Sequence, residues 1–193
     1  AEDITTTNGV LSGMTVSADP KVYRATFKPL DNPTAPSASI TVASGAYTDA
    51  AGNTGGAGTT PTISIDTLRP TASIVMANTA LIAGMSSAVT ITFNEAVTGF
   101  TNADLTIANG TLSAVTAMDG GWTWMASFTP TANTTDTSNL ITLTNSGVTD
   151  VAGNAGTGNT DSNNYTIDTL APTLSITSSV AAVKVGETAT ITF

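Results

Sequence analysis

The sequence predicts an all-β protein built from tandem β-sandwich domains. Two observations predict the strands: short segments alternate apolar and polar residues, and no segment has the period of an amphipathic helix. A third observation predicts the tandem arrangement, because segments of the 193-residue chain recur about 101 positions later. That spacing is the size of a whole domain rather than of a short solenoid repeat, so we expect consecutive domains of about 100 residues.

The clearest repeat is a polar loop. TDVAGNAG at 149–156 has a near copy in TDAAGNTG at 48–55, with Asp, Gly and Asn at the same offsets. A second match joins IDTLRPT at 65–71 to IDTLAPT at 167–173, and a third joins ITF at 91–93 to ITF at 191–193. If the seven strands expected in one copy are lettered A to G in chain order, the repeats predict three parts. These are an incomplete domain at 1–67 with strands C to G, a complete domain at 68–168, and strands A and B of a further domain at 169–193.

The complete copy opens with two expected strands. The first is 71–75, which follows Pro70 at the domain junction. The second, 89–93, alternates apolar and polar residues strictly, so one of its faces should be buried and the other solvated.

Two further strands, 104–107 and 111–115, flank the dipeptide Asn109-Gly110. Asn-Gly suits a tight type I′ hairpin because both central residues of that turn need a positive φ. The sequence therefore predicts that these two strands pair with each other.

Three strands complete the copy. Asp119-Gly120-Gly121 turns the chain into 122–128, and 140–143 and 164–167 follow. Seven short strands in about 100 residues are typical of an immunoglobulin-like sandwich. The chain has no Cys, so packing rather than a disulfide must stabilise the core.

The composition excludes several classes of function. Without Cys or His, the chain has no zinc–thiolate site, no catalytic Cys and no imidazole acid or base, so we do not expect an enzyme. A net charge of −9, from 14 acidic and 5 basic residues, should repel nucleic acid and anionic membrane surfaces. No run reaches the roughly 18 apolar residues of a membrane helix, so we expect no membrane insertion in this segment.

The run ITFNEAVTGFTNADLTIANGTLSAV, followed by DVAGN and YTIDTLAPT, resembles the bacterial Ig-like repeats of giant surface adhesins and biofilm-associated proteins. The resemblance covers essentially the whole chain. It implies an exported protein, extracellular at the cell surface or in the biofilm matrix, built as a long rod. It also implies calcium at the domain junctions.

Strand order brings several acidic side chains to one end of the complete domain. Glu95 follows the second strand, Asp104 opens the third, and Asp150 and Asn154 lie in the loop between the last two strands. Asp66 ends the preceding copy and reaches the same junction through a short linker. Clustered carboxylates repel one another, and calcium, which takes six to eight oxygen ligands, would relieve that repulsion. We therefore expect these five residues to form a calcium site at the junction.

The neighbouring copies carry matching residues. Asp3, Asp49 and Asn53 of the incomplete domain correspond to Asp104, Asp150 and Asn154, and Asp168 corresponds to Asp66. A cation site with the same ligands is therefore expected at every junction where the last strand of one copy leads into the next copy.

Simpler interpretations remain for each of these motifs. The loop DxxGN could be a turn in which Asp and Asn satisfy their own backbone. Glu95 and Asp104 resemble a glycosidase carboxylate pair, although a junction offers no deep cleft. Trp122 and Trp124 alternate on one strand, so one should enter the core while the other could form a sugar-binding surface.

The function predicted from the sequence is structural, namely a rod or filament segment of an extracellular surface or biofilm protein with calcium-stiffened junctions. Its expected partners are neighbouring copies of the same repeat, either in cis along a longer array or head to tail in trans by strand complementation. The alternative is an adhesive module that recognises a glycan or a host protein through its loops.

Overall fold

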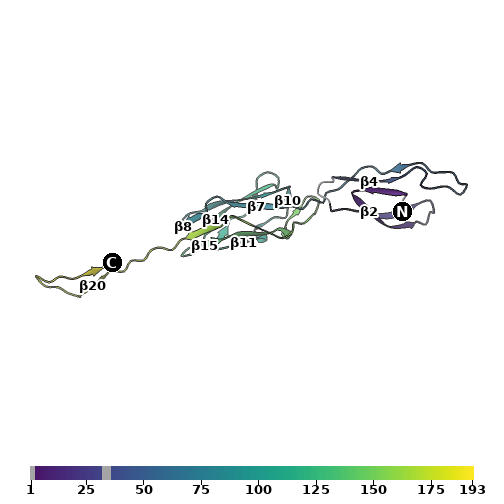
Figure 1. Cartoon of the computed structure of the whole chain (residues 1–193). Coiled ribbons are helices and arrows are strands. Elements are labelled where there is room, and N and C mark those ends of the chain that lie inside the picture. The colour runs from purple at the N-terminus through teal and green to yellow at the C-terminus, as the bar shows by residue number, and fades with distance from the viewer. Residues whose placement is uncertain (1–2, 32–35) are drawn as a thin grey trace.

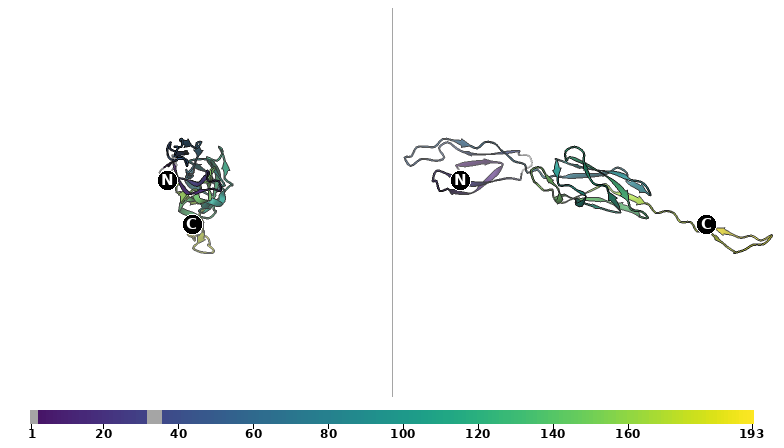
Figure 2. Two further views of the ribbon diagram at one scale, coloured as in Figure 1. Left: turned by 90° about the vertical axis from the view of Figure 1, so that its right-hand side faces the viewer. Right: turned by 180° about the vertical axis from the view of Figure 1, so that it is seen from behind.

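The computed structural model describes residues 3–31 and 36–193 and confirms the predicted all-β fold. The chain is elongated, with an N-terminal unit, a middle domain (residues 70–168) and a C-terminal segment (residues 169–193) following one another along one direction (Figure 1). In the view along this direction the three parts overlap, and in the view from behind they separate again (Figure 2). No helix in the described part of the chain is long and apolar enough to cross a membrane.

The first layer of the middle domain is one sheet in the order β12–β14–β9–β7, with β13 also paired to β14. Its strands are β7 (Ala72–Met76), β9 (Ser87–Phe93), β12 (Gly110–Leu112), β13 (Thr116–Ala117) and β14 (Thr123–Pro130).

The second layer has two short sheets, β11–β16–β18 and β15–β19–β8, in which only the β19–β8 pairing is parallel. Its strands are β8 (Ala80–Ile82), β11 (Leu105–Ile107), β15 (Thr135–Asn139), β16 (Ile141–Thr144), β18 (Asn159–Asp161) and β19 (Tyr165–Asp168). The turns η1 (Asn102–Asp104) and η2 (Asn145–Gly147) and the two-residue strands β10 (Val97–Thr98) and β17 (Thr149–Asp150) lie in the connecting loops.

The core lies between the two layers. Along β9 the side chains of Val89, Ile91 and Phe93 are buried while the residues between them face outward, which confirms the predicted alternation. From the other layer, Tyr165 is fully buried, and its ring meets that of Phe128 edge-on at 5.0 Å. Each large side chain buried in this way contributes about 1.5–3 kcal/mol to the free energy of unfolding, so packing can replace the missing disulfide.

The predicted Asn109-Gly110 hairpin is wrong. Asn109 does have a positive φ of 50°, but β11 pairs with β16, and β12 pairs with β14. The chain therefore crosses between the layers at this turn instead of reversing within one sheet. The Asn109 side chain serves the crossing, because its Nδ2 donates to Asn139 Oδ1 at 2.7 Å and to Asp136 Oδ2 at 2.9 Å.

The N-terminal unit repeats part of this architecture. β2 (Gly9–Val16) pairs with β3 (Tyr23–Pro29), while β4 (Ser37–Val42) pairs with β1 (Ile4–Thr7), β5 (Gly58–Thr59) and β6 (Ile63–Ser64). The registers also match, since Leu11 lies opposite Phe27 as Leu112 lies opposite Phe128. β2–β3 thus corresponds to β12–β14, and the β4 sheet corresponds to the second layer of the middle domain.

The C-terminal segment forms a small hairpin of β20 (Thr177–Ser178) and β21 (Ile191–Thr192). Its large apolar side chains are exposed, among them Leu174 at 71% and Phe193 at 80%. An isolated two-stranded hairpin is marginally stable in water, so this segment lacks the packing that the middle domain has.

Candidate metal centre

The repeated polar loop has the same conformation in both copies. Asp150 Oδ1 accepts a hydrogen bond from the Asn154 backbone N–H at 2.8 Å, and its Oδ2 accepts one from Asn154 Nδ2 at 2.7 Å. In the N-terminal unit the corresponding distances from Asp49 to Asn53 are 2.9 and 2.8 Å. The repeat in the sequence thus encodes a defined loop that fixes the direction of one carboxylate.

A short ladder brings this loop to Glu95. Strand β10 pairs with β17 so that Val97 lies opposite Asp150, and Glu95 is two residues before Val97. The loop after β9 and the loop before β18 are therefore joined by backbone hydrogen bonds. Two carboxylates that are 55 positions apart in the sequence consequently face one another.

The linker between the N-terminal unit and the middle domain, which is taken here as residues 66–69, is attached to the same two loops. Asn154 Nδ2 donates to the Asp66 carbonyl oxygen at 3.1 Å, and Arg69 Nη1 donates to the Ala155 carbonyl oxygen at 2.9 Å. Asn94 also binds the linker, since its Nδ2 donates to the Arg69 carbonyl oxygen at 3.3 Å. Asn94 was not predicted at the junction from the sequence.

These contacts gather three carboxylates. Asp66, Glu95 and Asp150 each offer an oxygen, and the three oxygens lie within 4.8 Å of one another. Asp150 is buried at 3% exposure, Glu95 is half-buried and Asp66 is exposed. Glu95 Oε1 is buried and has no hydrogen-bond partner among the described residues.

The electrostatics of the group are unbalanced. In the described part of the chain the one ion pair within 4.0 Å joins Lys184 to Glu187, so no Lys or Arg neutralises the three carboxylates. Two charges at this spacing repel by about 3 kcal/mol at an effective dielectric near 20, less where one of them is exposed.

The pKa values of Glu95 and Asp150 shift in opposite directions. Burial, followed by the charges of Asp150 and Asp66, raises the pKa of Glu95 above its usual value. Burial also acts to raise the pKa of Asp150, but the hydrogen bonds from Asn154, Gly153 and Ala152 outweigh it and lower that pKa. The group therefore holds one carboxylate that stays ionised and one that resists ionisation.

The profile of the bacterial Ig-like domain matches residues 1–65 and again residues 66–167. The chain belongs to the bacterial Ig-like domain family. No curated protein matches it. Domains of this family are typically non-catalytic structural modules that are extracellular or surface-exposed. The family match agrees with the sandwich topology of this Ig-like chain.

Two predicted ligands have other roles in this Ig-like chain. Asn154 presents its amide nitrogen to Asp150 and to Asp66, so it orients the site instead of pointing an oxygen into it. The Asp104 carboxylate caps η1 by accepting from the Thr101 N–H at 2.8 Å, and it does not belong to the group of three. Because this capping interaction uses the Asp104 carboxylate locally, Asp104 does not join the other carboxylates as expected.

The four residues predicted for neighbouring copies do not form a second group in this structure. Asp49 and Asn53 form their loop in the N-terminal unit, where Asp3 is also exposed. Asp168 lies at the end of β19, where its Oδ1 accepts from Thr135 Oγ1 at 3.1 Å. Asp168 lies at the other end of the middle domain from the N-terminal unit, so it is not a neighbour of Asp3, Asp49 or Asn53 in this structure.

The two tryptophans differ as predicted. Trp124 packs on the core and meets Phe100 edge-on at 5.2 Å, whereas Trp122 is 47% exposed.

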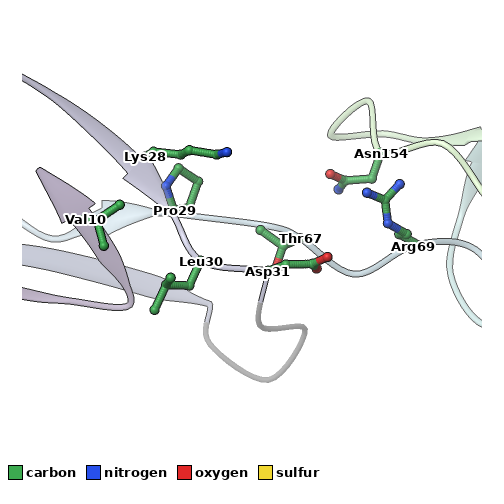
Figure 3. Close-up of a pocket in the computed structure, with 8 residues that line it drawn as sticks. All are labelled: Val10, Lys28, Pro29, Leu30, Asp31, Thr67, Arg69 and Asn154. Atoms are coloured by element: carbon green, nitrogen blue, oxygen red, sulfur yellow. The ribbon is translucent and has the colours of Figure 1, made fainter. Parts of the chain in front are cut away.

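A hollow of about 410 Å³ lies between the N-terminal unit and the linker. Figure 3 shows Lys28, Leu30 and Asp31 on one side of it and Arg69 and Asn154 on the other. In the described part of the chain, every hydrogen bond between the N-terminal unit and the middle domain involves the linker. The linker is therefore fixed to the middle domain, while the N-terminal unit itself packs loosely against it.

Proposed function

We propose that this chain is a rod segment of an extracellular bacterial surface protein whose junction is stiffened by calcium. The observation that supports this proposal best is the meeting of Asp66, Glu95 and Asp150 from three separate segments at the junction. One of the three comes from the linker itself, so a bound ion would connect the linker directly to the middle domain.

The chemistry of the group suits calcium. Calcium binds oxygen ligands at 2.3–2.6 Å, so two ligands on opposite sides of one ion are about 4.8 Å apart, which is the limit of the observed spacing. Carboxylates can bind in bidentate fashion, and backbone carbonyls and water can complete the shell. The ion would also offset the repulsion among the three carboxylates and would give Glu95 Oε1 the partner that it lacks among the described residues.

The proposed partners are neighbouring copies of the repeat, joined in cis along a longer array or head to tail in trans. An adhesive module has less support. The exposed Tyr23 and Tyr47 do line a common hollow, but the sheet residues Ile4 and Val42 also line it. This hollow therefore includes the inner face of a sheet and is not formed by loops alone.

Calorimetric titration of calcium into the 193-residue chain tests the site. We expect one binding event with a dissociation constant in the range of about 10⁻⁶–10⁻³ M. Glu95→Gln and Asp150→Asn should each weaken it at least tenfold, whereas Asp161→Asn, outside the group, should leave it unchanged. Binding that is absent, or that survives Glu95→Gln, would contradict the proposal.

Small-angle scattering tests the mechanical role separately. With calcium the angle between the N-terminal unit and the middle domain should be fixed. The maximum dimension of the particle should then be larger, and its distribution narrower, than in chelator. An identical profile in both conditions, together with measured calcium binding, would leave a metal site without a stiffening role.

A further inference from the structure

The crossing between the two layers of the middle domain requires both residues of the dipeptide Asn109-Gly110. Asn109 has a φ of 50°, a conformation that asparagine adopts more often than most other residues with a side chain. A Cβ at Gly110 would overlap the buried ring of Phe128, so only glycine fits there. The packing of the sandwich therefore places an asparagine directly before a glycine.

This dipeptide is chemically labile. The backbone nitrogen of the glycine, once it has lost its proton, can attack the asparagine Cγ, because glycine has no side chain that hinders the approach. A C–N bond forms, the bond from Cγ to Nδ2 breaks, and Nδ2 leaves as ammonia. Water then opens the five-membered ring at either of its two carbonyl groups, which gives aspartate or isoaspartate. The net reaction consumes water and releases ammonia, and nothing is oxidised or reduced.

The folded domain holds the nitrogen that would leave. Asn109 Nδ2 donates to Asp136 Oδ2 at 2.9 Å and to Asn139 Oδ1 at 2.7 Å, so both of its hydrogens are used. A carboxylate accepts only, so the atom that faces Asp136 must be the nitrogen. Asn139 Nδ2 donates to the Tyr165 carbonyl oxygen at 3.0 Å, which leaves Asn139 Oδ1 to face Asn109. The partners thus fix the orientation of both amides.

These contacts oppose ring formation in two ways. Asn109 is exposed, so water reaches it and burial does not protect it. Ammonia can leave only after Nδ2 has given up both hydrogen bonds. The ring also changes the backbone between Asn109 and Gly110, which is held by the hydrogen bond from the Thr131 N–H to the Asn109 carbonyl oxygen at 2.9 Å. The reaction therefore requires the crossing between the layers to open first.

We propose that Asn109-Gly110 is a latent modification site, which the folded sandwich protects and which unfolding of the middle domain exposes to conversion into aspartate or isoaspartate. This inference goes beyond the proposed calcium junction and does not depend on it. Because opened molecules are a small fraction under native conditions, the rate of conversion follows that fraction. Water is the only reagent, so the site needs no modifying enzyme.

Neither product fits the place that Asn109 occupies. Each has a carboxylate instead of an amide, so the oxygens of Asp136 and Asn139 then face an acceptor where they had a donor. Asn139 is 1% exposed, so water does not replace the lost donor at its Oδ1. Asp136 adds charge repulsion at the same point. Isoaspartate also lengthens the main chain by one carbon between β11 and β12. A converted domain should therefore fail to close again.

The chain has one other Asn-Gly dipeptide, Asn8-Gly9, which serves as a matched comparison. Asn8 has a φ of 53°, and its Nδ2 donates to the Ser37 carbonyl oxygen at 2.8 Å. The position of Asn139 is taken there by Ala38, which offers no side-chain acceptor. Conversion at Asn8 changes the mass and charge of the chain as conversion at Asn109 does, but it lies outside the middle domain.

Incubation of the 193-residue chain in mildly alkaline buffer, with and without denaturant, tests the protection. Chelator is present throughout, so the result does not depend on a cation. Peptide mapping by mass spectrometry should show conversion at Asn109 at least tenfold slower in the folded chain than in denaturant. In denaturant Asn8 and Asn109 should convert at similar rates, because both have lost their surroundings. Equal rates at Asn109 with and without denaturant would overturn the proposal.

Refolding of the partly converted sample tests the consequence. Size-exclusion chromatography separates the molecules whose middle domain is folded. These should contain Asn109 almost only in its unmodified form and Asn8 in both forms. Asn109→Asp should lower the folding equilibrium constant of the middle domain at least tenfold, whereas Asn8→Asp, with the same change of charge, should leave it unchanged. A folded fraction as rich in converted Asn109 as the whole sample, or an Asn109→Asp domain as stable as the wild type, would overturn the proposal even if calcium binding is measured.

Discussion

At the scale of single residues, the junction depends on carboxylates with opposite tendencies. Asp150 is held ionised by hydrogen bonds from its own loop, and Glu95 is pushed toward its protonated form by burial and by two neighbouring charges. A proton on Glu95 and a cation between the three carboxylates relieve the same repulsion. Acid and calcium should therefore compete at this site.

Calcium affinity should fall as the pH is lowered through the raised pKa of Glu95, which lies above the ordinary value of 4.5. In chelator, by contrast, the free energy of unfolding should fall as the pH is raised. The stabilisation from protonated Glu95 is fully present below pH 4.5 and is lost as the pH rises through the folded-state pKa of Glu95. Calorimetry and thermal unfolding between about pH 4.5 and 7 measure both trends. Glu95→Gln should remove both, and an affinity that is flat across this window would contradict the assignment.

Tyr165 is a second residue whose environment can be tested. Its hydroxyl donates to the Ala108 carbonyl oxygen, and burial followed by the charge of Asp136 raises its pKa from 10.0 to about 12. Tyr165→Phe leaves that carbonyl without its partner and should reduce the free energy of unfolding by about 1–3 kcal/mol in denaturant titrations. Between pH 10 and about 12 the wild-type chain, but not this variant, should lose additional stability as the unfolded tyrosine ionises. The exposed Tyr47→Phe is the control and should change little.

At the scale of elements, the loop TDxAGN is the unit that the repeat encodes twice. Its Asp, Gly and Asn interact within five residues, so the sequence predicts the loop without knowledge of the rest of the fold. Gly153 has a φ of 95° and Gly52 a φ of 88°, values that side-chain-bearing residues rarely adopt.

Gly153→Ala should therefore strain the loop. We expect a loss of about 1–2 kcal/mol in the free energy of unfolding and weaker calcium binding, because Asp150 loses its fixed direction. Gly58→Ala is the control, since a Cβ at Gly58 meets nothing within 4 Å and its φ lies outside the left-handed region. Equal effects of the two changes would show that the loop conformation does not depend on Gly153.

Strand order predicts that Glu95, Asp150 and Asp66 lie together, because loops at one end of a sandwich are neighbours. The sequence did not predict which strands pair with each other. Asn109-Gly110 was predicted as a hairpin because turn preference is local, whereas the choice of strand partner is decided by packing across the core. Strand β15, with the sequence TDTSN, was missed because it lacks apolar alternation, and it is held instead by the hydrogen bonds of Asn139.

At the scale of the whole molecule, three parts with equivalent sequences have unequal packing. The middle domain has a complete core, the N-terminal unit has an open one, and the C-terminal segment has none. The residues at corresponding positions are apolar in all three parts, so the parts differ in burial although their sequences match.

Hydrogen exchange should reveal this inequality. In the 193-residue chain, amides of β9, β14 and β16 should exchange slowest, and those of β1 to β4 should exchange orders of magnitude faster. Equal protection in the two sets of strands would contradict the difference in packing.

The parallel pairing of β8 with β19 has a consequence for a protein under tension. The chain enters the middle domain before β7 at one end and leaves it after β19 at the other (Figure 1). Pulling the two ends apart draws β8 and β19 in opposite directions along their own length. The rungs from Ala80–Thr166 to Ile82–Asp168 are then loaded in shear and must break together rather than one after another. The same three residue pairs that close the sandwich thus form a mechanical clamp that lies along the direction in which the chain would be stretched.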